Sequence, residues 1–236
     1  MLALAAFALL LAQADAGARA APPPGATGPG AGKVSGKVTL SGLPPKLAPL
    51  PVTRDIKTCG SSKPDESLEV GQGGGVKNAV LWIVDGPKPA KADEIKVTLD
   101  QKQCEFAPHV LALPAGATLS IVNGDKLFHN VHAREGDRTV FNYAMPVPNH
   151  VIPRPLKEAG LLRVTCDVHP WMRAWVDVLP TSAFAVTDDA GAFAIAGVPP
   201  GKYTLRLWHE RLGEKDQEVQ VTAGGTSTVD VQLTPR

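Results

Sequence analysis

Four side chains in two short segments have the types and spacing needed to bind one metal ion. Cys166, His169 and Met172 lie in the run Cys-Asp-Val-His-Pro-Trp-Met, and His129 lies earlier in Phe-His-Asn-Val. A loop with two residues between successive donors can fold a thiolate, an imidazole and a thioether around one ion. A thiolate favours copper or zinc over magnesium or calcium, and two His with one Cys and a weak axial Met are typical of blue-copper electron-transfer sites. The sequence therefore predicts copper binding.

Both segments resemble the ligand segments of the cupredoxin family. The Cys-x-x-His-Pro-x-Met loop is similar to that of amicyanins, and Phe-His-Asn-Val is similar to the first-ligand segment of plastocyanins. The resemblance covers about residues 94–180, and it implies a Greek-key β-sandwich with one copper ion in a type 1 site. The ligands that it implies are His129, Cys166, His169 and Met172.

The same resemblance implies roles for residues next to the ligands. Asn130 matches the family residue whose side chain braces the two ligand-bearing loops. The imidazole edge of His169 is expected near the surface, in an apolar patch where redox partner proteins dock. Pro170 and Trp171 are candidates for that patch, and the other interpretation of Trp171 is ordinary core packing, because Trp is usually largely buried.

Other histidines compete with these candidates. Positions three apart in a strand point to opposite faces, so only one of His129 and His132 can aim at the metal. The resemblance selects His129, and His132 is then an exposed or hydrogen-bonded imidazole. We interpret His109 and His209 as structural.

The cysteine count leaves a pair. The chain has 3 cysteines, and an odd cysteine in an exported protein needs an explanation. If Cys166 is a metal thiolate, Cys59 and Cys104 remain and are candidates for a disulfide in an oxidising compartment. The alternative is two buried free thiols.

The first residues predict export. Residues 1–14 are rich in Leu and Ala and are followed by small residues, so we predict a signal peptide over 1–20. This run is too short for a membrane span. Residues 21–32 are a Pro/Gly linker. We expect a periplasmic or extracellular protein.

Composition narrows the class of protein. The net charge is +1, so nothing indicates a nucleic-acid partner, and the 23 Gly and 22 Pro among many short β-branched runs indicate an all-β protein. No phosphate-binding loop, Ser/His/Asp arrangement or paired-carboxylate motif stands out. We therefore expect that the chain is not an enzyme by itself.

A second pattern surrounds the predicted copper domain. Residues 186–207 contain Thr-Asp-x-x-Gly-x-Phe and then Pro-Gly-x-Tyr-x-Leu, which resembles the carboxypeptidase regulatory-like domain, a small prealbumin-like β-sandwich. The two strands that precede this motif in that family match residues 32–42 and 76–84. We therefore predict that the cupredoxin domain, 94–180, is inserted into a second sandwich. The predicted parts of this sandwich are 33–93 and 181–236.

Two questions of organisation and function stay open at this point. A tandem arrangement, in which residues 33–90 only extend the copper domain, is the alternative to insertion. The leading function is an exported carrier of single electrons, whose second sandwich contacts the cell envelope or other proteins. The alternatives are a copper chaperone or storage protein, and a cell-surface or carbohydrate-binding module with an accessory copper site.

Overall fold

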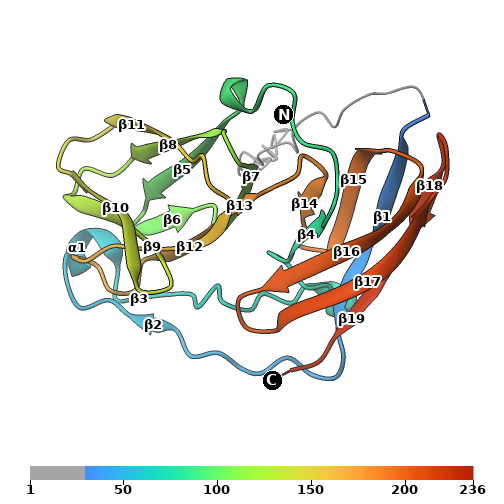
Figure 1. Cartoon of the computed structure of the whole chain (residues 1–236). Helices are drawn as coiled ribbons and strands as arrows, with labels where there is room; N and C mark the ends of the chain where they lie inside the picture. The colour runs from blue at the N-terminus through green and yellow to red at the C-terminus, as the bar shows by residue number, and fades with distance from the viewer. Residues whose placement is uncertain (1–29, 236) are drawn as a thin grey trace, which may run out of the picture.

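The structure is built almost entirely of β-strands, which confirms the predicted all-β class. The computed structural model describes residues 30–235, so the predicted signal peptide and most of the linker lie outside the described residues. Figure 1 shows two β-sandwiches beside each other, one formed between residues 96 and 179 and the other by strands from both ends of the described chain. Among these residues, no helix has the length and apolar character to cross a membrane.

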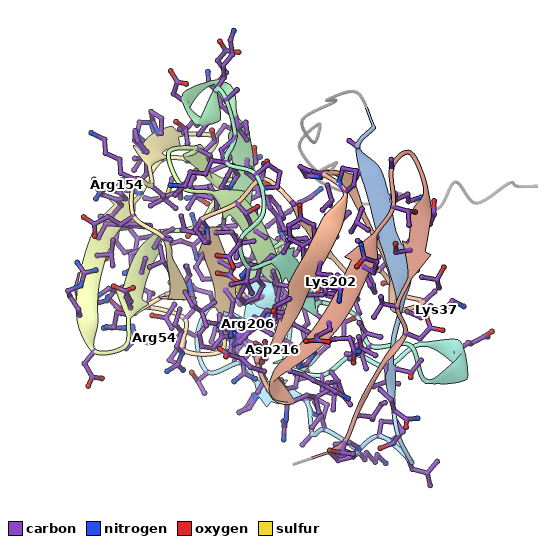
Figure 2. The ribbon with its side chains drawn as sticks, turned by 45° about the vertical axis from the view of Figure 1, so that its right-hand side comes forward. Lys37, Arg54, Arg154, Lys202, Arg206 and Asp216 are labelled. Carbon is purple, nitrogen blue, oxygen red and sulfur yellow. A yellow bond between two sulfur atoms is a disulfide. The ribbon has the colours of Figure 1, made fainter. Side chains whose placement is uncertain are left out.

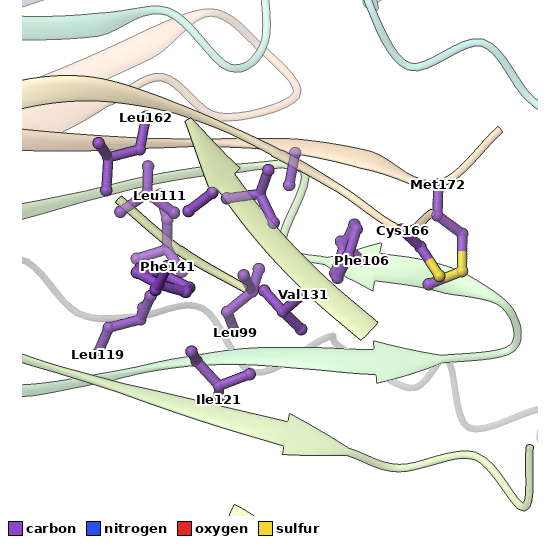
Figure 3. Close-up of a cluster of buried hydrophobic side chains, with 14 of the residues drawn as sticks. Leu99, Phe106, Leu111, Leu119, Ile121, Val131, Phe141, Leu162, Cys166 and Met172 are labelled. Atoms are coloured by element: carbon purple, nitrogen blue, oxygen red, sulfur yellow. The ribbon is translucent and has the colours of Figure 1, made fainter. Parts of the chain in front are cut away.

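The first sandwich encloses its core between two sheets, with the strand orders β10-β9-β12-β13-β7 and β11-β8-β5-β6. The strands are β5 (Lys96–Lys102), β6 (Glu105–Ala107), β7 (Val110–Pro114), β8 (Thr118–Asn123), β9 (His129–Glu135), β10 (Arg138–Met145), β11 (Val151–Pro155), β12 (Gly160–Thr165) and β13 (Arg173–Leu179). In β8, buried residues alternate with half-buried ones, because successive side chains of a strand point to opposite faces. Leu119 and Ile121 of this strand therefore lie in the core (Figure 3).

The second sandwich is made from strands on both sides of the first. β1 pairs with β15, β18 and β19, and the other sheet has the order β14-β4-β16-β17. The strands are β1 (Gly32–Leu40), β4 (Val80–Ile83), β14 (Phe184–Val186), β15 (Ala192–Val198), β16 (Gly201–His209), β17 (Gly213–Val221), β18 (Thr226–Thr228) and β19 (Val231–Leu233). Both sheets thus combine strands from before and after residues 94–180, as the insertion hypothesis requires. The domain boundaries themselves stay a prediction.

The Thr-Asp-x-x-Gly-x-Phe motif forms the turn that leads into β15. The Thr187 hydroxyl donates a hydrogen bond to the Val76 carbonyl, 2.8 Å away, which ties the turn to the segment before β4. Oδ1 of Asp188 accepts two backbone N–H groups of the turn. Gly191 has φ 72°, and a Cβ there would lie 2.2 Å from the Val38 carbonyl oxygen, so only glycine fits.

The connection from β1 to β4 leaves the second sandwich and reaches the first. It contains β2 (Leu50–Pro51), the single helical turn α1 (Ile56–Cys59), β3 (Ser62–Lys63) and the 3-10 turn η1 (Gln72–Gly74), and a second 3-10 turn, η2 (Ala92–Glu94), follows β4. Figure 1 shows α1 at the end of the first sandwich that is remote from β1. We call residues 50–63 the strap.

The two sandwiches pack against each other through a third group of buried side chains. The rings of Trp175 and Trp208 lie 5.3 Å apart, centroid to centroid. His109 Nε2 and Glu210 Oε2 lie 2.8 Å apart and add a polar contact between the sandwiches. The remaining buried members of the group are Val80, Val110, Ala112, Leu179 and Phe184.

Candidate metal centre

The predicted donors lie together at one end of the first sandwich. His129 is the first residue of β9, and Cys166 directly follows β12, which is the neighbour of β9 in the sheet. β12 and β13 are antiparallel neighbours, so the segment between them turns back tightly, and Met172 directly precedes β13. Within this loop, Cys166 N donates to Met172 O over 3.3 Å and Met172 N donates to His169 O over 2.9 Å. The loop therefore folds its donors toward one point.

Three of the four predicted donor atoms converge. Nδ1 of His129 lies 2.9 Å from Nδ1 of His169, and Sγ of Cys166 lies 3.7 Å from the same His169 atom. All three side chains are buried. Met172 is buried beside them, and Figure 3 shows its side chain and that of Cys166 pointing toward each other. The structure thus brings three of the four predicted donors together, and Met172 lies buried next to Cys166.

Each imidazole is held at its outer nitrogen by a carboxylate. Nε2 of His129 lies 3.0 Å from Oδ2 of Asp125, and Nε2 of His169 lies 2.9 Å from Oδ2 of Asp55. An ionised carboxylate only accepts hydrogen bonds, so each Nε2 carries the proton and each Nδ1 presents a lone pair to the other and to the Cys166 sulfur. Metal-binding histidines typically have such partners, which fix the tautomer and the ring orientation.

This arrangement fits a soft or borderline cation such as copper. The Nδ1 atoms of the two imidazoles lie 2.9 Å apart with Cys166 Sγ beside them, which is close enough for all three to contact one small cation. Burial lowers the pKa of His129, which favours the neutral imidazole that binds a metal. The donors are two nitrogens, one thiol sulfur and one thioether sulfur, a combination that suits copper better than a hard cation.

Asn130 connects β9 to the ligand loop. Its Oδ1 accepts the backbone N–H of Asp167 over 2.7 Å and lies 3.4 Å from Cys166 Sγ. Its Nδ2 donates to Oδ2 of Asp167 and to Oδ1 of Asn142, each over 2.9 Å. Asn130 is thus placed where it can brace the two ligand-bearing segments.

The other histidines are engaged elsewhere. His132 Nδ1 contacts the Asp167 carboxylate at 3.1 Å, and its Nε2 contacts Thr139 Oγ1 at 2.8 Å, so it points away from the three donors. His109 lies between the two sandwiches. His209 is buried in the second sandwich, and this burial lowers its pKa to about 4.

The expected surface position of His169 is wrong. Its side chain is 0% exposed, and Asp55 of the strap lies against its outer nitrogen. Trp171 is also buried, its ring 5.0 Å from that of His169, and its Nε1 donates to the Cys104 carbonyl over 3.0 Å. The predicted docking of partners at an exposed His169 edge therefore does not fit this structure.

The strap is tied to the metal end of the sandwich. Cys59 of the strap and Cys104 form a disulfide, with a Cα–Cα distance of 5.5 Å, and Cys166 is a buried free thiol. The backbone N–H of Cys104 donates to Asp125 Oδ2 over 2.8 Å. The same carboxylate oxygen therefore contacts His129 and the backbone next to the disulfide.

Asp55 and Asp125 were missed by the sequence analysis. Asp125 lies four residues before His129, so a search for acidic residues near each ligand would have found it. Asp55 is separated from His169 by 114 positions, and no local pattern links the two.

A comparison with protein families found a match for one part of the chain. Residues 169–234 match the family model of the carboxypeptidase regulatory-like domain, so the match begins within the ligand loop and covers the C-terminal strands of the second sandwich. This confirms the predicted resemblance for that segment. A search of curated proteins found no significant match.

A search of solved structures returned copper proteins. Amicyanin from Paracoccus versutus is 22% identical, covers 42% of this chain and is itself covered over 96% of its length, with a TM-score of 0.33. A purple cupredoxin from Nitrosopumilus maritimus is 19% identical, with 36% of this chain and 99% of that chain covered and a TM-score of 0.30.

The copper-containing nitrite reductase from Thermus scotoductus is 21% identical, with 36% of this chain covered and a TM-score of 0.32; the similarity spans only 22% of the reductase. Among these comparisons, the family match is the one to the carboxypeptidase regulatory-like domain, over residues 169–234.

Proposed function

We propose that the chain is an exported type 1 copper protein that carries single electrons between redox partner proteins, and that it is not an enzyme by itself. The observation that supports this proposal best is the convergence of His129 Nδ1, His169 Nδ1 and Cys166 Sγ in a buried site. When bound, copper supplies one-electron chemistry, and its potential is tuned by the axial ligand and by the surroundings of the Cys sulfur.

The protein's own residues would keep the donors in place during electron transfer. The donors sit on the end of β9 and in a short hairpin loop closed by hydrogen bonds, while Asn130, Asp55 and Asp125 hold their orientation. Burial excludes water from all of them. Such a site changes its geometry little between oxidation states, which favours fast electron transfer over catalysis on a substrate.

The proposal places the protein in the periplasm or outside the cell. The disulfide between Cys59 and Cys104 supports this location, because such bonds persist in oxidising compartments and are rare in the cytosol.

Titration with Cu(II), followed by visible absorption and electron paramagnetic resonance, tests the ligand set. We expect an intense thiolate-to-copper band that saturates at one ion per chain and is absent in Cys166→Ser. Met172→Leu should keep the band but shift the reduction potential, since the axial ligand tunes it. Ile195→Val, a conservative change in the core of the second sandwich, is the control and should leave the potential unchanged. A coloured site in Cys166→Ser would overturn the assignment.

Copper storage is the second candidate, and one observation favours it. Both imidazoles are 0% exposed, which suits an ion that is kept rather than an electron that is passed quickly. Rapid electron exchange of the copper-loaded protein with a small redox reagent would favour the carrier. Slow electron exchange together with tight retention of copper would favour storage.

A further inference from the structure

We propose that the strap, residues 50–63, is a fixed cover over the metal centre, and that Asp55 is the positioning residue through which it holds His169. This inference rests on the proposed copper site and adds a segment of the chain that shields it. The strap comes from the chain segment between β1 and β4 and so belongs in sequence to the second sandwich, yet it closes the ligand loop of the first.

Several independent contacts attach the strap to the first sandwich. Val52 and Cys59 are buried in the core of that sandwich, and the disulfide joins Cys59 to the turn between β5 and β6. At the end of the strap, Lys63 Nζ donates to the Gln103 carbonyl and lies 3.4 Å from the Glu105 carboxylate. The strap is therefore held at both ends and in the middle.

The strap is also closed on itself, so it can act as one unit. β2 pairs with β3, and Val52 N donates to Ser61 O over 3.1 Å. Between them, the carbonyl of Asp55 accepts the N–H groups of Thr58 and Cys59 over 2.8 and 2.9 Å, which forms the turn of α1.

The Asp55 side chain is directed at the metal centre rather than at its own helix. Asp55 stands at the start of α1 with φ 49° and ψ 34°, and its carboxylate makes no capping hydrogen bond. Oδ2 instead lies 2.9 Å from Nε2 of His169. The Asp55 side chain is 44% exposed, whereas that of His169 is 0% exposed. Solvent therefore meets the carboxylate, and the imidazole stays behind it.

This placement has two consequences for a bound ion. His169 cannot swing outward to release the ion unless the Asp55 contact breaks and the strap moves. A docking protein, likewise, cannot touch the His169 ring and must approach the strap instead. The cover therefore predicts slow metal exchange and a bound imidazole proton that exchanges slowly with water.

Two measurements on the full chain test this, one without metal and one with it. In metal-free protein with isotope-labelled histidine, the Nε2 proton of His169 should give a slowly exchanging nuclear magnetic resonance signal, and Asp55→Ala should lose it. In protein loaded with Cu(I), transfer of copper to the chelator bathocuproine disulfonate should be faster in Asp55→Ala. Removing such an outer partner typically weakens metal affinity by about 10- to 100-fold.

Matched variants separate the role of Asp55 from general destabilisation. Asp55→Asn keeps an acceptor but removes the charge, so its transfer rate should fall between wild type and Asp55→Ala. Asp216→Ala removes a carboxylate that pairs with Arg206 at 2.7 Å between β16 and β17 of the second sandwich (Figure 2), and should behave as wild type.

The outcomes distinguish the cover from the copper site itself. If wild type binds no copper, the proposed function fails. The proton signal of the metal-free protein still tests whether the strap covers His169. If copper binds but Asp55→Ala matches wild type in both transfer rate and proton exchange, the cover is overturned and the copper site stands.

Discussion

At the scale of single residues, the candidate site depends on polar groups that touch the donors rather than on the donors alone. Asp55 and Asp125 each take the outer nitrogen of one imidazole, so both Nδ1 atoms are left free for a metal. Oδ1 of Asn130 contacts the Cys166 sulfur and accepts the backbone N–H of Asp167 in the ligand loop. These three residues decide how accurately the donors are placed.

Replacing Asn130 should weaken both the fold and the site. Asn130→Ala removes four polar contacts around the ligand loop and leaves the part-buried backbone N–H of Asp167 without its acceptor. We expect a loss of about 2 kcal/mol in the free energy of unfolding, together with a shifted reduction potential of the copper form. Urea unfolding and voltammetry measure the two effects. Unchanged values in both would show that Asn130 is not a brace.

At the scale of elements, the strap combines parts that carry no regular pattern. Its strands are two residues each and its helix is a single turn, so its conformation is set by the disulfide and by burial of Val52 rather than by propensity. Irregular segments of this kind are often the functional ones, because a rigid scaffold positions them.

Removing the disulfide should destabilise the protein by releasing a long loop. Cys59 and Cys104 are 45 positions apart, and the chain-entropy model assigns a loop of this length about 4 kcal/mol. Cys59→Ala combined with Cys104→Ala should therefore lower the denaturation midpoint and loosen the strap, which faster proteolysis within residues 50–63 would report. A midpoint equal to that of wild type would show that packing alone fixes the strap.

The ligand loop and many strands are predictable from the sequence, whereas the strap is not. Alternation at Leu119 and Ile121 and the spacing from Cys166 to Met172 are local signals that the structure retains. Contact between Asp55 and His169 arises only when the chain returns after 114 positions. No periodic pattern in the sequence predicts such a long-range contact, so the expectation of an exposed His169 was wrong.

At the scale of the whole molecule, the contact between the sandwiches contains a buried acid. Asp177 of β13 lies beside this contact, and burial, with a smaller contribution from the charge of Glu214, raises its pKa to about 7. Since the ordinary value is 3.8, the folded protein holds this proton over a pH range where the unfolded chain has lost it. Ionising Asp177 therefore costs stability.

The sign of this effect gives a pH prediction. As pH rises from about 4 to about 7, the contribution of Asp177 to stability falls, by about 4 kcal/mol in total at 1.36 kcal/mol per pKa unit. Asp177→Asn removes this loss, so the difference in unfolding free energy between the variant and wild type should grow in favour of the variant between pH 5 and pH 8. Urea unfolding at several pH values measures it. A difference that does not change with pH would contradict a raised pKa.

The pairing of β1 also constrains the order in which the protein forms during synthesis. Lys37 of this strand donates its N–H to Asp230, 193 positions later, and β1 pairs with strands that end at residue 233. The strands of the first sandwich are contiguous, so they can assemble before the strands from β14 onward are made. β1 is synthesised before its partners and must wait for them until residue 233 has been made, and during that time it is an unpaired strand open to aggregation.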